Sequence, residues 1–428
     1  TPLYSSAASD VYKRQGLNNK MNSNNKIFIA GSLANGACFS MILPLLAPFI
    51  RQLGLTELQG GALVSAGALV MAISAIYISK QTQKFSIYQL LSIGFIGMAI
   101  TWGLFAAVLS YGLSYAISFA ALFSLLILTR ASTGFFMAMP QIALQSYVMT
   151  AFQSEQERSQ NMAKFGALNS LGVVIGPLAT TLLLTWSMLT PLWGAVAILT
   201  GMAAWIVLAF QGKQASQTQE RDETTAKLQD VSTKKLQWSK LGIWLLLGFS
   251  LYVAIVTLNL TAGFYIQDRF HFDTYQSAMY FSQCSLIVGI ALILMQLAIS
   301  KWFKWSIKQL LWVGLVTMVL GLILSLSASQ IWTFQAAYIF YGIAVACLIP
   351  AFTTGAAQTA PTTLQTKIAS LCTATQALSF VFAPLLSTGL YQWNQHLPYY
   401  FLLALMTGLM LYFSFKHIQA NKDLSSVA

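Results

Sequence analysis

Long apolar segments separated by short polar breaks run along almost the whole chain. A helix needs about 20 apolar residues to cross the hydrocarbon core of a bilayer. Segments of suitable length lie near residues 27–50, 60–79, 87–110, 118–148, 164–186, 190–211, 240–266, 275–299, 307–328, 331–354, 367–391 and 397–416. The pattern therefore predicts twelve transmembrane helices.

The composition indicates the same class of protein. The 428 residues are 57% hydrophobic and 8% charged, whereas soluble domains carry about 25% charged residues. The mean hydropathy is +0.66. Continuous apolar runs favour helices over a transmembrane barrel, whose strands alternate apolar and polar residues. We expect an all-α, multi-pass membrane protein.

Basic residues follow the predicted membrane topology. One side of the predicted bilayer receives nearly all of them, and the other side receives only Arg51 and Arg269. Loops rich in Lys and Arg stay in the cytoplasm, so both termini are expected there. The net charge of +12 is thereby accounted for, and we expect no nucleic-acid partner.

Polar stretches divide the chain into five parts. Residues 1–20 differ from the rest and are expected to be a non-native leader before Met21. Residues 212–239 are rich in Gln, Thr, Lys and Glu and predict a flexible cytoplasmic linker. This places six helices in residues 21–211, six in residues 240–417, and a cytoplasmic tail at 418–428.

Two sequence matches relate the halves. Residues 84–94 match residues 304–314 at an offset of 220, and residues 167–178 match residues 374–385 at an offset of 207. Each pair occupies an equivalent place in its half and keeps the same membrane orientation. Parallel six-helix repeats are one transporter architecture, with the substrate site near the midplane between the repeats.

Three short motifs resemble those of the major facilitator superfamily, in particular the tetracycline-exporter-like group of drug/proton antiporters. They are Arg130-Ala-Ser-Thr-Gly134 in the fourth segment, Gly172-Val-Val-Ile-Gly176-Pro177 in the fifth, and Met41-Ile-Leu-Pro44-Leu-Leu-Ala-Pro48 in the first. The resemblance implies the major facilitator fold, alternating access, and efflux by proton antiport, with drug resistance as one outcome. It also implies that Gly134, Gly172, Gly176 and Pro177 shape their helices.

The loop after the second segment departs from that family's pattern. It lacks the expected glycines and aspartate but keeps Lys80 and Lys84, and Lys301 stands at the equivalent turn of the second half. We expect these three lysines to contribute to the conformational change.

Arg130 is the one charge deep in a predicted segment. It lies about eight residues, or ~12 Å, inside its helix, and a charge at that depth is costly. Gly134, Met137, Gln141 and Gln145 recur on its face at helical spacing. Two interpretations stay open: a cavity cation that binds an anionic group of the substrate, or a structural arginine paired with helix-end carbonyls.

None of the eleven acidic residues lies deep in a predicted segment. Glu57, Asp268 and Asp273, at the external ends of helices, are the nearest candidates for a proton site; the alternative, which the sequence favours, is that they are solvated loop charges. Further cavity candidates are uncharged amides, although such side chains also join helices structurally. These candidates are Asn35, Asn169, Asn259, Gln283 and Gln376.

The four cysteines and three histidines show no ligand spacing, so we expect no metal, no cofactor and no enzymatic activity. The leading hypothesis is a monomeric secondary transporter that exports a small organic molecule, with protons as coupling ion. The first alternative is an exporter of an anionic siderophore or carboxylate metabolite, with Arg130 as the anion site. The second is an importer, or a membrane sensor that does not transport.

Overall fold

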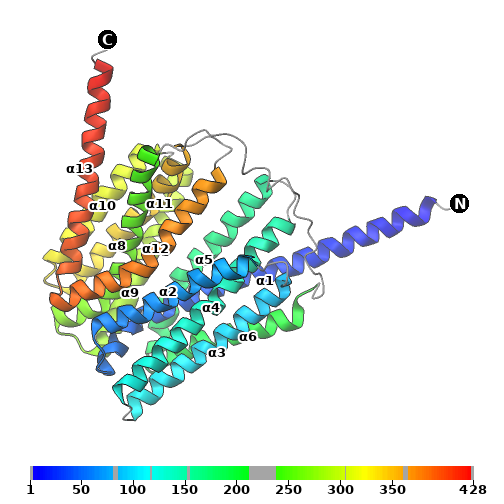
Figure 1. Ribbon diagram of the computed structural model, residues 1–428, viewed down its shortest axis with the longest axis horizontal. Helices are drawn as coiled ribbons and strands as arrows, with labels where there is room; N and C mark the ends of the chain where they lie inside the picture. The colour runs from blue at the N-terminus through cyan, green and yellow to red at the C-terminus, as the bar shows by residue number, and fades with distance from the viewer. Residues whose placement is uncertain are drawn as a thin grey trace. The chain divides into compact units, whose positions relative to one another are not determined.

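The computed structural model describes residues 3–80, 85–115, 118–151, 155–211, 238–303, 305–359 and 365–425. These ranges fold into twelve α-helices and one short π-helical turn, with no strand among them (Figure 1). The helices are α1 (Leu3–Gln52), α2 (Glu57–Lys80), α3 (Ile87–Ser114), α4 (Phe119–Ala151), α5 (Glu155–Leu184), α6 (Thr190–Ala209), α8 (Trp238–Phe270), α9 (Thr274–Ala298), α10 (Ile307–Ser327), α11 (Ile331–Ala357), α12 (Gln365–Trp393) and α13 (Leu397–Ser425), with the turn η2 (Ile299–Phe303) after α9.

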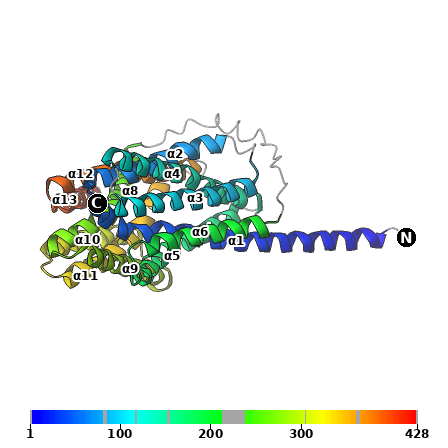
Figure 2. The ribbon, with the colours of Figure 1, turned by 90° about the horizontal axis from the view of Figure 1, so that it is seen from below.

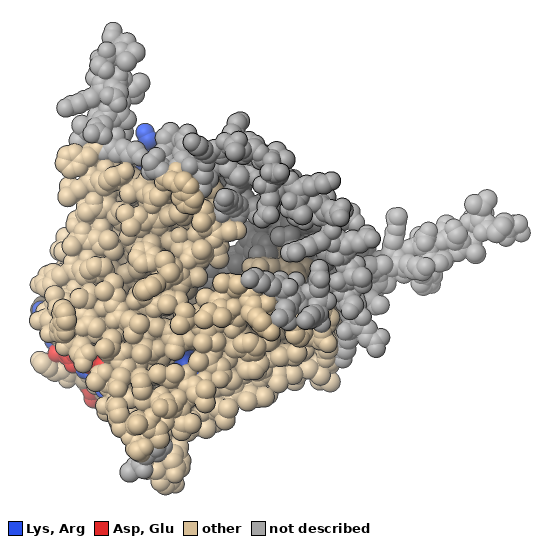
Figure 3. All heavy atoms as spheres, viewed as in Figure 1, with Lys and Arg blue, Asp and Glu red and all other residues tan. Residues whose placement is uncertain are grey.

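Eleven helices of the described ranges are long and apolar enough to cross a membrane. The remaining one, α5, has a shorter apolar part at Leu171–Leu184 because its first half is polar. Lys, Arg, Asp and Glu are sparse on the described surface that faces the viewer in Figure 3. The predicted all-helical membrane fold with twelve helices is confirmed.

The chain divides into two compact units. The first unit comprises Thr1–Ile42 and Ala66–Gln229, and the second comprises Leu43–Ser65 and Asp230–Ala428. Residues 43–65, which are the end of α1, the following turn and the start of α2, therefore pack with helices of the second half of the chain. The predicted linker at 212–239 lies almost entirely outside the described residues.

The matched segments 84–94 and 304–314 begin α3 and α10 in the same way. Each helix starts with a capping box, in which a serine hydroxyl accepts from the backbone N–H three residues on and the glutamine there accepts from the serine N–H. The pairs are Ser86 with Gln89 and Ser306 with Gln309. In both helices this capping box gives backbone N–H groups at the helix start a hydrogen-bond partner that the helix itself does not supply.

A glycine eight residues after each of these serines admits the neighbouring helix. A Cβ at Gly94 would lie 2.6 Å from Cδ of Pro140 on α4, and a Cβ at Gly314 would lie 2.5 Å from Cγ of Leu348 on α11. Helices α3 and α4 run side by side, as do α10 and α11 (Figures 1 and 2). The sequence repeat thus corresponds to a repeated way of packing.

Candidate functional site

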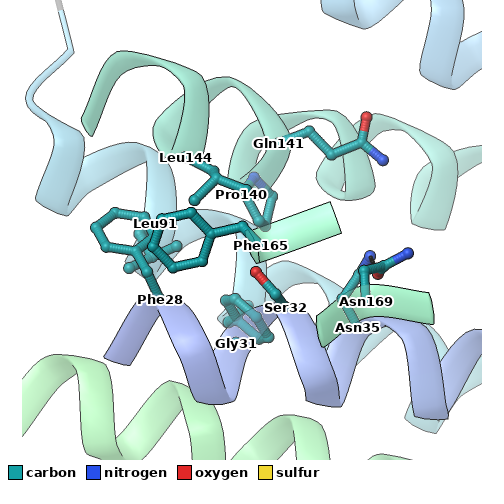
Figure 4. A pocket seen from close by; sticks show the side chains of 11 residues that line it. Phe28, Gly31, Ser32, Asn35, Leu91, Pro140, Gln141, Leu144, Phe165 and Asn169 are labelled. Carbon is teal, nitrogen blue, oxygen red and sulfur yellow. Dashed lines mark hydrogen bonds between the residues drawn. The ribbon is translucent and has the colours of Figure 1, made fainter. Parts of the chain in front are cut away.

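A cavity of about 210 Å³ lies within the first unit, where α1, α3, α4 and α5 approach one another. Figure 4 shows aromatic rings at one end and amide side chains at the other. The lining residues are Phe28, Gly31, Ser32, Asn35, Leu91, Phe95, Pro140, Gln141, Leu144, Phe165 and Asn169. None of them is charged, so the wall offers apolar surface and neutral hydrogen-bonding groups.

The amide end is formed by three of the residues that the sequence singled out. Asn35 of α1 donates through Nδ2 to Oδ1 of Asn169 on α5 over 3.4 Å. That separation is long for an N–H···O hydrogen bond, whose usual length is about 2.9–3.0 Å. Gln141 projects from α4 at the same end of the cavity (Figure 4). Because each amide carries two donor hydrogens and an acceptor oxygen, the three groups retain capacity for a ligand.

The opposite end is a packed aromatic floor that the sequence reasoning missed. The ring of Phe28 stacks on Tyr147 with centroids 4.2 Å apart and meets Phe165 edge-on at 6.3 Å. Phe28 and Phe165 are only 2% and 1% exposed, so tight packing holds both rings in place. This floor gives a rigid apolar boundary rather than an open stacking surface.

Close contact between α1 and α5 positions the asparagine pair. A Cβ at Gly172 would lie 2.9 Å from the backbone N of Ala37 and would overlap the Leu33 carbonyl, and one at Gly176 would lie 2.5 Å from the Ala37 carbonyl oxygen. Pro177 follows inside α5 and is buried. The two glycines therefore let the helix backbones touch about one and two turns from Asn169.

Arg130 lies elsewhere on α4. It is 8% exposed, and its guanidinium carbon lies 5.6 Å from the ring centroids of both Trp102 and Phe105 on α3. Its buried Nε has no hydrogen-bond partner among the described residues. A Cβ at Gly134 would overlap the backbone of Gly67, so α2 and α4 cross closely one turn from the arginine.

Arg130 and the two glutamines of its face do not share the cavity. Gln141 is eleven residues further along α4, which corresponds to ~16 Å of helix rise, and only Gln141 lines the cavity. Gln145 is exposed one turn beyond and lies outside the lining. Helical periodicity places these residues on one face of α4. The neighbours that cover that face change along the helix: Arg130 lies against aromatic rings of α3, whereas Gln141 lines the cavity.

The remaining amide candidates belong to the second unit. Asn259 donates to the Ile255 carbonyl one turn earlier, over 2.8 Å. Gln283 accepts from Nε2 of the buried Gln335 over 2.8 Å. Gln376 is half-buried on α12. Their predicted contact with substrate remains a prediction.

The lysines assigned to the conformational change are only partly covered by the structure. Lys301 is exposed in η2. Nothing is described for the side chain of Lys80, and Lys84 lies outside the described residues.

A second polar site, here called the charge cluster, comprises Arg51, Glu57, Asp268 and Tyr391 and lies within the second unit. Both terminal nitrogens of Arg51 donate to the Asp268 carboxylate, Nη2 to Oδ2 over 2.6 Å. Nη2 also pairs with Glu57 over 3.0 Å. The Tyr391 hydroxyl donates to Oδ2 of Asp268 over 2.6 Å. Sequence analysis named both acids as external candidates but not their partners.

The family model of the Major Facilitator Superfamily matches residues 28–384. No curated protein sequence matches significantly.

Three solved structures share the fold at low identity. A crystal structure of the nucleoside transporter NupG has a TM-score of 0.67 at 13% identity, covering 92% of this chain and 99% of that chain. A bacterial homolog of the human lysosomal transporter Spinster, in an inward-facing and occupied conformation, has 0.65 at 12%, covering 87% and 81%. The human organic anion transporter MFSD10 has 0.61 at 16%, covering 91% and 99%.

These findings agree with the helical architecture and the repeated packing. A family match that extends over most of the chain assigns the protein to a class of multi-pass secondary transporters for small molecules, not to enzymes. The chain belongs to the major facilitator superfamily.

Proposed function

We propose that the protein exports a small organic molecule across the bacterial inner membrane by alternating access, and that the cavity of the first unit is part of its substrate site. Support comes from the convergence of Asn35, Gln141 and Asn169 on one cavity. Clefts that combine apolar walls with a few convergent polar groups are the usual form of small-molecule sites.

The cavity favours an uncharged group of the substrate. Its lining carries no charged side chain, and burial of an ion without a partner is costly. Its volume of about 210 Å³ is below the roughly 300–1,000 Å³ typical of drug-sized ligands. A neutral hydrogen-bonding moiety, such as a base, sugar or amide, therefore fits better here than a bulky drug.

An anionic metabolite or siderophore bound at Arg130 is the second candidate. The unpartnered Nε of this buried arginine supports it, because a carboxylate supplied by the substrate would complete its hydrogen bonding. The two candidates make different demands on the same protein. The first needs the amides of the cavity, and the second needs the guanidinium.

Flux in proteoliposomes separates the candidates. We suggest neutral and anionic members of matched pairs, such as a nucleoside with its 5′-monophosphate and a carboxamide with its carboxylate. A nucleoside is a reasonable first substrate because NupG shares the fold. Gln141→Ala is expected to lower flux of neutral substrates, whereas Gln145→Ala, one turn outside the cavity, should leave it unchanged.

Arg130→Lys tests the anion site, since a lysine cannot reproduce bidentate contact. Loss of anion flux with normal folding would favour the second candidate over the first. Equal effects of the two glutamine variants would refute the cavity as substrate site. No flux of any substrate would support a sensor, and uptake without efflux would support an importer.

Proton antiport is the proposed coupling. We expect export to decline when the pH gradient is collapsed while the membrane voltage is held constant. Export that continues unchanged under those conditions would exclude proton coupling.

A further inference from the structure

The cavity of the first unit is apolar at one end and polar at the other (Figure 4). The rings of Phe28 and Phe165, which form the aromatic floor, are buried. At the amide end, Asn35 and Asn169 are half-buried and Gln141 is exposed. The amide end is therefore the open end, and a molecule that enters meets carboxamides at the mouth and carbon at the floor.

The volume of the cavity sets the size of the group that fits. An apolar cavity of about 150 Å³ binds benzene, and this cavity has about 210 Å³. In proportion to benzene, the space holds roughly eight non-hydrogen atoms. That number corresponds to one six-membered ring with two substituent atoms.

The aromatic floor selects a group with an apolar edge. Phe28 stacks on Tyr147 with ring centroids 4.2 Å apart, and side chains packed in this way have little freedom to move aside. A sugar carries hydroxyl groups around its whole ring, so some of them would lie unpaired against the floor, which is costly. A ring with carbon on one edge and polar atoms on the other avoids that cost.

The amide end selects the polar atoms of the opposite edge. A carboxamide presents N–H donors beside a carbonyl acceptor, and its bidentate partner presents a donor and an acceptor side by side, as adenine does to asparagine or glutamine. A cis-amide within a ring has this arrangement. A carboxylate has two acceptors and no donor, and its charge would have no partner in a lining without charged residues.

The two asparagines are fixed by backbone contact but only weakly bonded to each other. A Cβ at Gly36 would overlap the Asn169 carbonyl oxygen and would lie 3.1 Å from the backbone N of Val173, so α1 and α5 touch beside both asparagines. The bond from Asn35 to Asn169 is 3.4 Å long, which is weak. A ligand can therefore replace that bond without moving the helices, and a site held in this way is preorganised.

We propose that the cavity of the first unit recognises a flat ring that contains a cis-amide, that is, a lactam ring. The ring enters with its apolar edge toward Phe28 and Phe165, and its N–H and C=O pair with the carboxamides at the mouth. A larger substrate extends from the ring past Gln141, which is exposed. This inference rests on the proposed function and narrows the substrate to one class of neutral molecule.

Two probes of equal shape test the proposal in solution. They are 5-methyl-2-pyridone, a lactam with a methyl group on its apolar edge, and 5-methyl-2-pyranone, in which a ring oxygen replaces the N–H. Isothermal titration calorimetry of the full chain in one detergent gives the dissociation constant of each probe. We expect the pyridone to bind at least about tenfold more tightly, because the pyranone leaves a carboxamide oxygen unpaired.

Variants of the amide end assign that preference to the cavity. Asn35→Leu and Gln141→Met replace a carboxamide with an apolar side chain of similar size, and each should lower the ratio of the two dissociation constants at least about threefold. Gln145→Met is the matched control, because Gln145 is exposed on the same helix and lies outside the lining. The ratio compares two probes on one preparation, so a partly unfolded sample does not change it. If Asn35→Leu does not fold, Gln141→Met at its exposed position provides the test.

Equal affinities for the two probes, binding of neither probe, or a ratio that both amide variants leave unchanged would overturn the proposal. Calorimetry requires no transport, so its outcome is independent of the flux assays. A preference for the pyridone in a protein without flux would refute the proposed function alone. Flux of neutral substrates that depends on Gln141, without a preference between the probes, would refute the lactam site alone.

Discussion

The arginine buried on α4 allows a direct test of whether its charge serves structure or transport. We predict that Arg130→Met leaves the folded state about as stable as before, or slightly more stable. The guanidinium loses attraction to two rings, each worth roughly 0.5–2 kcal/mol. Against this, the variant removes a buried Nε without a partner, which costs about 1–3 kcal/mol. The two effects nearly cancel.

Arg51→Met provides the matched comparison. Arg51 has two carboxylate partners in the described structure, and removing it leaves Asp268 and Glu57 without their cation. Breaking a fully buried pair costs about 3–5 kcal/mol, whereas exposed pairs are worth about 0.2–1 kcal/mol. The cluster is partly exposed, so we expect a loss of ~1–3 kcal/mol.

The assay is thermal unfolding of both variants in the same detergent at one scan rate, since irreversible unfolding makes the midpoint depend on scan rate. Flux is measured on the same preparations. We expect Arg51→Met to melt at a lower temperature than Arg130→Met, and Arg130→Met to lose flux of anionic substrates if that candidate is right. An Arg130→Met protein less stable than Arg51→Met would refute the reasoning and establish a structural role for Arg130.

Two further predictions concern helix contact and pH. Gly172→Ala places a Cβ against the α1 backbone and should lower the stability by ~1–3 kcal/mol through overpacking. Gly201→Ala is the control: a Cβ there would have no atom within 4 Å, so this variant should be neutral or more stable by up to ~1 kcal/mol. Equal melting temperatures of the two variants would contradict the close contact between α1 and α5. Burial, followed by the nearby Arg269 charge, lowers the pKa of His396 below 6.5. The folded state therefore binds fewer protons than the unfolded state as the pH falls below 6.5. The contribution of His396 to the free energy of unfolding is complete above pH 6.5. It is lost as the pH falls through the lower pKa that His396 has in the folded state. The melting temperature should fall on acidification in the unmodified protein and fall less in His396→Gln; identical pH profiles would contradict the assignment.

The helices could be predicted from sequence because a bilayer leaves few options. Backbone groups inside lipid must bond within their own segment, so each long apolar run indicates one helix. The predicted starts at 87 and 307 agree with the capped starts of α3 and α10. The start of α5 was expected near 164 but lies at Glu155. The first half of α5 is polar, and polar residues can form a helix outside the membrane. Hydropathy detects only the apolar part of such a helix.

The candidate site was predictable in part. Polarity in an apolar segment singled out Asn35, Gln141 and Asn169, which the structure places around one cavity. The same reasoning grouped Arg130 with Gln141, although they lie at different depths of α4. Periodicity assigns a residue to a face of its helix, but which neighbour covers that face depends on how the helices pack.

Sequence alone determined that this chain spans a membrane, that it repeats, and which of its few polar residues stand among apolar neighbours. Those properties depend on local composition and spacing. Tertiary structure alone decided that Arg51 meets Asp268, 217 residues away, and that Arg130 meets aromatic rings instead of a carboxylate. A charge does not specify its partner. That choice follows from which helices pack together and at what depth, and packing depends on the shapes of many side chains at once.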